Sequence, residues 1–471
     1  MNSELFDKYI VFQSERDSLC ARSWFKLSVL SLICAGLLSL LLILARTPLF
    51  TPLVTDPHFF KRCLVVHVNL ALSVWVYSFI AFLFYAFLPG TENGLKGIFG
   101  FFISASGVVM MILSAYIPGA KPVLSNYIPV IEHPVYLTGF SFFAIGLLIS
   151  FVDNRLIKKV EGEFKAFRTA IKVSVIFFIL AMEILIVAYI NAPDLFSVNY
   201  FEVLFWGAGH ILQFSSEAAK ISVWILLITL LTKENKFFHR SAFILIILFL
   251  LPALILTPIL MTFNPTDTFY RTYFTGLMRW AIFPFVTMFL LLCIYTLAKY
   301  KIRKLEYTDI RVSGFAMSAL LTVAGFIFGA LIKGPNTMVP AHYHASIGSV
   351  TVSFMAVSYI LLEKIGYKFP EERYSKFIPI QPIIFGSGQL IFALGFAVAG
   401  AQGQGRKIFG AEQYVKGIMD YIGLTLMGVG GMIAIVGGVL FLIIIARSLI
   451  IGVQDGFILN RYKTLEVTYG K

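Results

Sequence analysis

The sequence predicts an all-α integral membrane protein with about twelve transmembrane helices. Hydrophobic residues make up 58% of the 471 positions and charged residues only 13%, whereas soluble domains carry about 25% charged residues. The mean hydropathy is high, at +0.85. The apolar residues also gather into runs of about 20, the length that one helix needs to cross a bilayer.

These runs follow one another with only short polar loops between them. We therefore expect a single polytopic membrane domain over 1–471, with its helix bundle over 26–448. The first 25 residues are polar and lack the apolar core and cleavage site of a signal peptide, so 1–25 is expected to be a cytoplasmic segment and 449–471 a cytoplasmic tail. The predicted helices lie near 26–46, 62–88, 97–117, 133–152, 168–192, 199–232, 240–263, 273–298, 313–334, 338–363, 377–401 and 418–448.

The net charge of +13 is distributed as in an oriented membrane protein rather than a nucleic-acid-binding one. Loop 193–199 has no Lys or Arg, and loop 264–273 has only Arg271. Cytoplasmic loops of membrane proteins are rich in Lys and Arg. This distribution predicts a bacterial-type inner membrane protein whose two termini lie on the cytoplasmic side. The basic loops carry Arg155, Lys158, Lys159 and Lys165, then Lys299, Lys301, Arg303, Lys304 and Arg311, and then Lys364, Lys368, Arg373 and Lys376.

The four cysteines form no CxxC pair. This excludes a covalent heme c site and a Cys-rich zinc site. We expect all four to be inert.

Histidines are the side chains with the clearest functional signal. In the predicted topology, even-numbered helices run from the outer to the inner face, and His67, His133, His342 and His344 lie near the start of such helices. His210 lies about a dozen residues into the sixth helix. All five are therefore expected in the outer half of the membrane, where an ionisable residue is functional by default.

His342 and His344 belong to an H-x-H pair at the start of the tenth helix. A two-residue step rotates a helical side chain by about 200°, so the two rings point to opposite flanks and could each hold a different cofactor. Imidazole is a common axial ligand of heme iron. His67 and His344 could clamp one heme, while His342 could hold a second heme that His210 faces. In the alternative interpretation, each ring simply bonds to a backbone carbonyl.

The order of helices and histidines resembles the catalytic subunit I of the heme–copper oxidases and the related nitric oxide reductases. The local sequences look closer to the reductase-like and C-type branches than to the mitochondrial type. That family has twelve helices, with ligands at the positions of His67, His210, His342 and His344. The resemblance implies a low-spin bis-histidine heme on His67 and His344 and a five-coordinate high-spin heme on His342. It also implies a second metal, Cu or Fe, on His210.

The loop GAQGQGRKIFG carries Arg406 and Lys407, where the family has a basic pair that binds heme propionates. Arg pairs readily with carboxylates. The alternative is an ordinary soluble basic loop. His133 either joins this network or caps its helix.

The sequence departs from the family where further ligands of the second metal are expected. The seventh predicted helix, 240–263, ends ILTPILMTFNP without a histidine. Counting from His210 with the spacing of the reductases leads to Met261 and Thr262. Met binds Cu(I), but Thr is a poor ligand, so a three-histidine copper site is not expected. His210 with Met261 and water could hold a metal weakly, or the site could contain heme alone. Phe214 replaces a tyrosine of some oxidases, and the reductases' glutamate region carries Arg279, a cation that needs a propionate or Glu217 as partner.

Glu217 and Lys220 lie three residues apart, on one face of the sixth helix. Glu217 could relay protons to the neighbourhood of His210. The candidate catalytic residues are therefore His210 and Glu217. The alternative is a buried Glu217–Lys220 ion pair that only stabilises packing.

The favoured function is a respiratory terminal reductase that passes electrons from the low-spin to the high-spin heme to reduce O₂ or NO. It would need an electron-donor subunit, or cytochrome c or quinol, and a lipid bilayer, but no nucleic acid. The first alternative is a repurposed family member whose hemes serve electron transfer, gas sensing or assembly. A third hypothesis is a cofactor-free transporter. Such proteins typically show inverted repeats and broken helices, and the sequence shows neither clearly.

Overall fold

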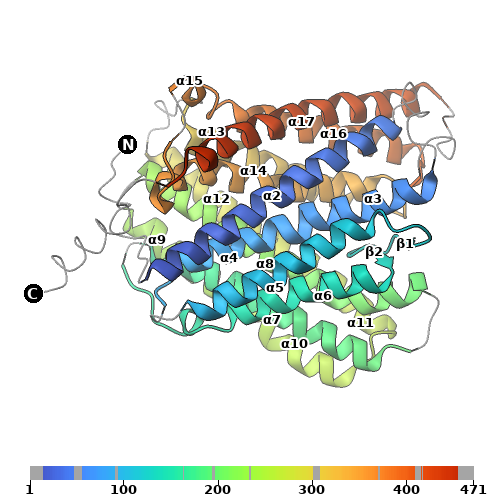
Figure 1. The fold of residues 1–471 in the computed structure, drawn as a ribbon, viewed down its shortest axis with the longest axis horizontal. Helices are drawn as coiled ribbons and strands as arrows, with labels where there is room; N and C mark the ends of the chain where they lie inside the picture. The colour runs from blue at the N-terminus through green and yellow to red at the C-terminus, as the bar shows by residue number, and fades with distance from the viewer. Residues whose placement is uncertain are drawn as a thin grey trace, which may run out of the picture.

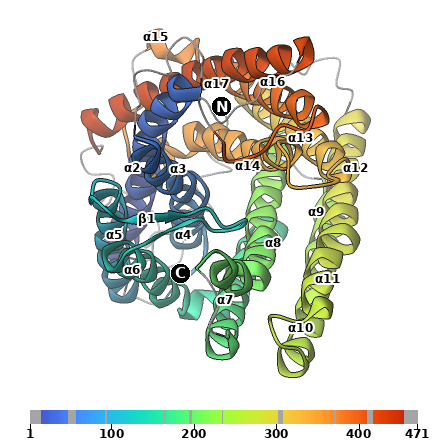
Figure 2. The ribbon, with the colours of Figure 1, turned by 90° about the vertical axis from the view of Figure 1, so that its right-hand side faces the viewer.

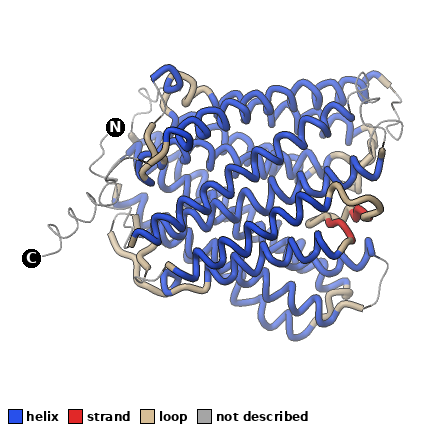
Figure 3. Tube along the Cα trace, viewed as in Figure 1, coloured by secondary structure: helices blue, strands red, loops and turns tan. Residues whose placement is uncertain are grey.

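The protein is described by a computed structural model covering residues 14–46, 56–90, 94–162, 164–193, 197–232, 235–300, 308–369, 372–408, 415 and 417–453. It is a bundle of long helices with one short strand pair at one end (Figures 1 and 3). The helical spans are, in order, α2 (Glu15–Arg46), α3–η2–α4 (Pro57–Asn69, Leu70–Val74, Trp75–Phe87), α5 (Leu95–Ser114), α6 (Pro134–Phe151), α7 (Lys165–Asn191), α8 (Ser197–Thr232), α9–α10 (Lys236–Leu248, Leu251–Thr262), α11–η4–α12 (Thr268–Leu277, Met278–Ile282, Phe283–Lys299), α13 (Ile310–Ala330), α14 (Met338–Leu361), α16 (Gln381–Ala401) and α17 (Ile418–Ile451). Short elements are β1 (Lys121–Val123), β2 (Val130–Glu132), η3 (Asn154–Leu156), η6 (Glu363–Ile365) and α15 (Glu372–Ser375).

The twelve predicted membrane spans are confirmed within these residues, each long and apolar enough to cross a bilayer. The spans follow one another around the bundle, so that α17 returns beside α2 (Figure 2). The first described helix begins, and the last one ends, at the same end of the bundle (Figure 1). An even number of spans requires this arrangement.

The first span begins earlier than hydropathy predicts. The polar residues from Glu15 onward form the first turns of α2, whereas residues 1–13 of the polar segment expected over 1–25 lie outside the described residues. Asp17 is 2% exposed and accepts from the buried Arg155 at 2.5 Å, and Asp153 pairs with the same guanidinium at 3.0 Å. A charge pair can be buried when it is compensated in this way, so the helix continues beyond its apolar stretch.

Three spans are interrupted. The seventh is divided into α9 and α10 next to Pro252, which cannot donate a helical hydrogen bond. The second and eighth contain the π-helical turns η2 and η4. Such turns are rare and frequently mark functional sites.

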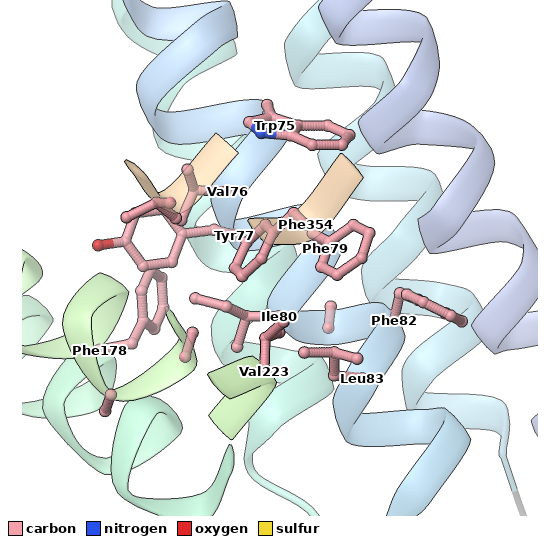
Figure 4. Close-up of a cluster of buried hydrophobic side chains, with 14 of the residues drawn as sticks. Trp75, Val76, Tyr77, Phe79, Ile80, Phe82, Leu83, Phe178, Val223 and Phe354 are labelled. Atoms are coloured by element: carbon pink, nitrogen blue, oxygen red, sulfur yellow. The ribbon is translucent and has the colours of Figure 1, made fainter. Parts of the chain in front are cut away.

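Helix α4 lies at the centre of the bundle, and all of its side chains are buried. Phe79 stacks on Phe354 of α14 with ring centroids 4.3 Å apart, and Tyr77 packs on Phe178 of α7 at 5.1 Å (Figure 4). The Tyr77 hydroxyl also donates to the Leu212 carbonyl of α8 at 2.8 Å. Helices α4, α7, α8 and α14 are thus fixed against one another, and they carry or support the candidate ligands.

Helices α5 and α6 pack through glycines whose backbones nearly touch. A Cβ added at Gly146 would lie 2.3 Å from the Gly100 carbonyl oxygen and 2.3 Å from the Ser104 Oγ. Small residues of this kind allow helices to approach closely inside membranes.

Replacing Gly146 with alanine is expected to push these two helices apart, because a backbone oxygen cannot move without its helix. Overpacking of this kind costs about 1–3 kcal/mol, which would lower the thermal unfolding temperature in detergent. Gly276→Ala is the matched control, since a Cβ at Gly276 meets nothing within 4 Å. Equal unfolding temperatures for the two variants would contradict this account of the α5–α6 contact.

Candidate heme cavity

A cavity of about 2170 Å³ lies inside the bundle. Sites for single small molecules measure about 300–1,000 Å³, so this one has room for more than one large group. Both π-helical turns contribute to its wall, through Ala71 and Leu72 of η2 and Met278 and Arg279 of η4. The candidate site residues His67, His210, Glu217, His342, His344, Arg406 and Lys407 all line it.

His67 projects from the end of α3, just before the π-helical turn η2. Its Nδ1 donates to the Ala35 carbonyl oxygen of α2 at 2.9 Å. A carbonyl only accepts, so Nδ1 carries the proton and Nε2 carries the ring's lone pair. A hydrogen bond of this kind on the remote nitrogen is how proteins orient a ligating imidazole.

The H-x-H rings contact different neighbours, in agreement with the 200° step. The His342 Nδ1 donates to the Gly325 carbonyl oxygen of α13 at 2.7 Å. His344 stacks on Phe396 of α16 with centroids 5.4 Å apart and meets Phe392 edge-on at 4.8 Å. Three imidazoles, two with oriented lone pairs, therefore line one large apolar cavity, and this donor set fits two hemes.

His210 has a different environment from the other three. It is 1% exposed, and its Nδ1 donates to the Trp206 carbonyl oxygen at 2.6 Å. The Tyr127 hydroxyl lies 2.7 Å from its Nε2. Sequence reasoning missed Tyr127, because no spacing or motif links that loop residue to α8.

The residues around His210 do not fit a second metal. Met261 is 84% exposed and does not line the cavity, so the expectation that it could assist His210 is wrong. The Thr262 hydroxyl donates to its own helix, at the Pro258 carbonyl. Across the described part of the chain, no three His, Cys, Asp or Glu side chains gather closely enough to hold a metal ion.

Glu217 and Lys220 form the buried ion pair that the sequence offered as an alternative. The Lys220 Nζ lies 2.7 Å from the Glu217 Oε2 and also donates to the Thr322 Oγ1 at 3.0 Å and the Ser349 Oγ at 3.4 Å. The Lys220 side chain is 1% exposed and that of Glu217 is 11% exposed. Glu217 nevertheless lines the cavity, so the ion pair does not remove it from the site.

Arg406 and Lys407 hold the loop that precedes β2. Arg406 donates to the Asn126 Oδ1, and Lys407 donates to the Leu124 carbonyl. Burial lowers the pKa of Lys407 to about 8, with a further lowering from Arg406 and an opposing effect of Glu202. A cation on an ordinary soluble loop lies wholly in water, whereas Lys407 is partly buried and lines the cavity.

His133 and Arg279, the remaining polar candidates, have contrasting positions. His133 caps α6, where its Nδ1 accepts from the Val135 amide at 3.3 Å, and it does not line the cavity. Arg279 does line the cavity, and no carboxylate of the described residues lies within 4.0 Å of it. Its expected partner Glu217 is paired with Lys220 instead.

Comparison with known proteins identifies the family. A solved heme–copper terminal oxidase dimer superposes with a TM-score of 0.71 at 16% identity, covering 96% of this chain and 90% of that one. An uncharacterized protein of Aquifex aeolicus is 29% identical, covering 77% of this chain and 89% of its own length. An uncharacterized protein of Rickettsia prowazekii is 27% identical, covering 93% of this chain and 97% of its own length.

The family described as "Cytochrome C and Quinol oxidase polypeptide I" matches residues 20–440, nearly the whole bundle. The matched residues include all or part of every helix that lines the cavity. The chain therefore belongs to the heme–copper oxidase subunit I family, and it is an integral membrane oxidoreductase of electron transport.

Proposed function

We propose that this chain is the heme-containing subunit of a respiratory terminal reductase that reduces O₂ or NO. The observation that carries the proposal is the convergence of His67, His342 and His344 on one cavity large enough for two hemes. His67 and His344 would hold a low-spin heme, and His342 a five-coordinate high-spin heme. When bound, the hemes would supply electron transfer and an iron that binds the gas.

The chain's own residues orient these groups and supply charge. The hydrogen bonds to Ala35 and Gly325 fix the rings of His67 and His342. Arg406 and Lys407 line the cavity and would pair with heme propionates by charge-assisted hydrogen bonds. Glu217 would accept and release a proton at Oε1, since its Oε2 is engaged by Lys220.

The proposed reductase depends on partners, because the chain has no cytochrome c motif of its own. An electron-donor subunit, or cytochrome c or quinol, would deliver electrons. The basic-loop distribution favours a bacterial-type inner membrane with both termini cytoplasmic.

A second candidate function is favoured by the surroundings of His210. The Tyr127 hydroxyl occupies its Nε2, and no three His, Cys, Asp or Glu side chains of the described residues gather as a metal site would need. A family member with two hemes and no such metal could serve electron transfer, gas sensing or assembly.

A pyridine hemochrome spectrum, combined with O₂ and NO consumption by the purified protein with an artificial electron donor, tests both candidates. We expect two hemes per chain and consumption of one gas. His133→Ala is the control and should keep both hemes, because His133 caps α6 away from the cavity. Two hemes without gas consumption would favour the second candidate, and absence of heme would contradict both.

A further inference from the structure

Both ring nitrogens of His210 have hydrogen-bond partners. The Trp206 carbonyl accepts from Nδ1 at 2.6 Å, so Nδ1 carries the proton of the neutral ring. Nε2 then has one lone pair, and the Tyr127 hydroxyl donates to it at 2.7 Å. A metal ion would need that same lone pair, so the tyrosine and a metal exclude each other.

Aromatic rings, rather than ligands, surround this histidine. The ring centroid of Tyr127 lies 4.4 Å from that of His210, that of Trp206 5.0 Å and that of Phe274 6.0 Å. Gly209 lets Tyr127 approach α8 closely, because an added Cβ at this position would lie 2.6 Å from the Tyr127 Cβ. Such an environment suits a neutral hydrogen-bonded pair, and the nearby Glu202 carboxylate accepts a hydrogen bond from Asn126.

Tyr127 belongs to a segment, Leu124–Tyr127, that several hydrogen bonds tie to the bundle. Lys407 donates to the Leu124 carbonyl, and Arg406 donates to the Asn126 Oδ1. Glu202 of α8 accepts from Asn126, and the Tyr127 hydroxyl donates to His210. The segment thus connects the basic pair to His210, and all four of its residues line the cavity.

We propose that Tyr127 replaces the second metal as the partner of His210, and that this metal-free pair pins the Leu124–Tyr127 segment against the cavity. The inference rests on the proposed heme cavity and refines it. The site is then a heme-only centre, with a phenol and an imidazole where the family has a second metal.

Metal content is the first test. The holoprotein is purified from cells supplied with copper and iron, and heme iron, measured by hemochrome, is subtracted from total metal. We expect no stoichiometric non-heme Cu or Fe in the wild type, in His210→Ala or in Tyr127→Phe. One non-heme metal per wild-type chain that His210→Ala loses would overturn the proposal. Missing heme in the same sample would instead contradict the proposed function, so the two failures are distinguishable.

Hydrogen exchange of the backbone amides near 124–127 is the second test, and it does not depend on His210→Ala folding well. Loss of one buried hydrogen bond should accelerate exchange by a factor of about 2 to 12 in Tyr127→Phe. Tyr116→Phe is the control, since Tyr116 is 63% exposed. Equal exchange rates in the two variants would show that the hydroxyl does not pin the segment, which overturns that part of the proposal.

Discussion

Replacing His344 with alanine is expected to remove the low-spin heme and leave the other heme bound. His344 leaves α14 toward Phe392 and Phe396 of α16, whereas His342 leaves the same helix toward α13. If His67 and His344 hold one heme and His342 the other, as proposed, loss of the His344 ring would deprive the low-spin heme of one of its two ligands and leave His342 in place. The measurement is the heme content per chain, together with low-temperature reduced-minus-oxidised and EPR spectra, which distinguish the two spin states.

His342→Ala should give the reciprocal result, with the high-spin signal lost and the low-spin signal retained. His58→Ala is the control, because His58 is exposed in the first turn of α3 and should change neither signal. If His344→Ala kept both signals, or lost both while the protein stayed folded, the assignment of the two flanks would be wrong.

The number of spans could be predicted from hydropathy, but their interruptions could not. A bilayer requires internally satisfied backbone in every span, so each apolar run of sufficient length becomes a helix. The π-helical turns after His67 and around Arg279 lie within apolar runs. Hydropathy therefore does not distinguish them from regular α-helix. The extension of α2 to Glu15 depends on Arg155, a residue 138 positions from Asp17 in sequence, which no local pattern shows.

The candidate ligands could be predicted because a histidine in a membrane span is rare and its depth follows from topology. Tyr127 could not be found in this way. It lies in a connection whose path is set by contacts with Arg406, Lys407 and His210. Met261 shows the opposite error, since the reductases' spacing from His210 suggested a ligand there but the side chain is 84% exposed.

The Glu217–Lys220 pair gives the second large expected effect. Glu217→Gln leaves the Lys220 ammonium, 1% exposed, without its carboxylate. Breaking a buried pair by removing one partner costs about 3–5 kcal/mol. We expect a marked fall in the unfolding temperature for Glu217→Gln. The double variant Glu217→Gln/Lys220→Met should recover much of the loss, because it leaves no unpaired charge.

The same variants separate the two roles that the sequence left open for Glu217. A residue that only stabilises packing should regain turnover when the double variant regains stability. A proton-relaying Glu217 predicts that turnover stays low in the double variant, because the amide cannot exchange the proton at Oε1. Thr322→Val is the matched control: it removes one hydroxyl that accepts from Lys220 while the ion pair stays intact. Recovery of both stability and turnover in the double variant would therefore remove Glu217 from the catalytic residues and leave it as a structural partner of Lys220.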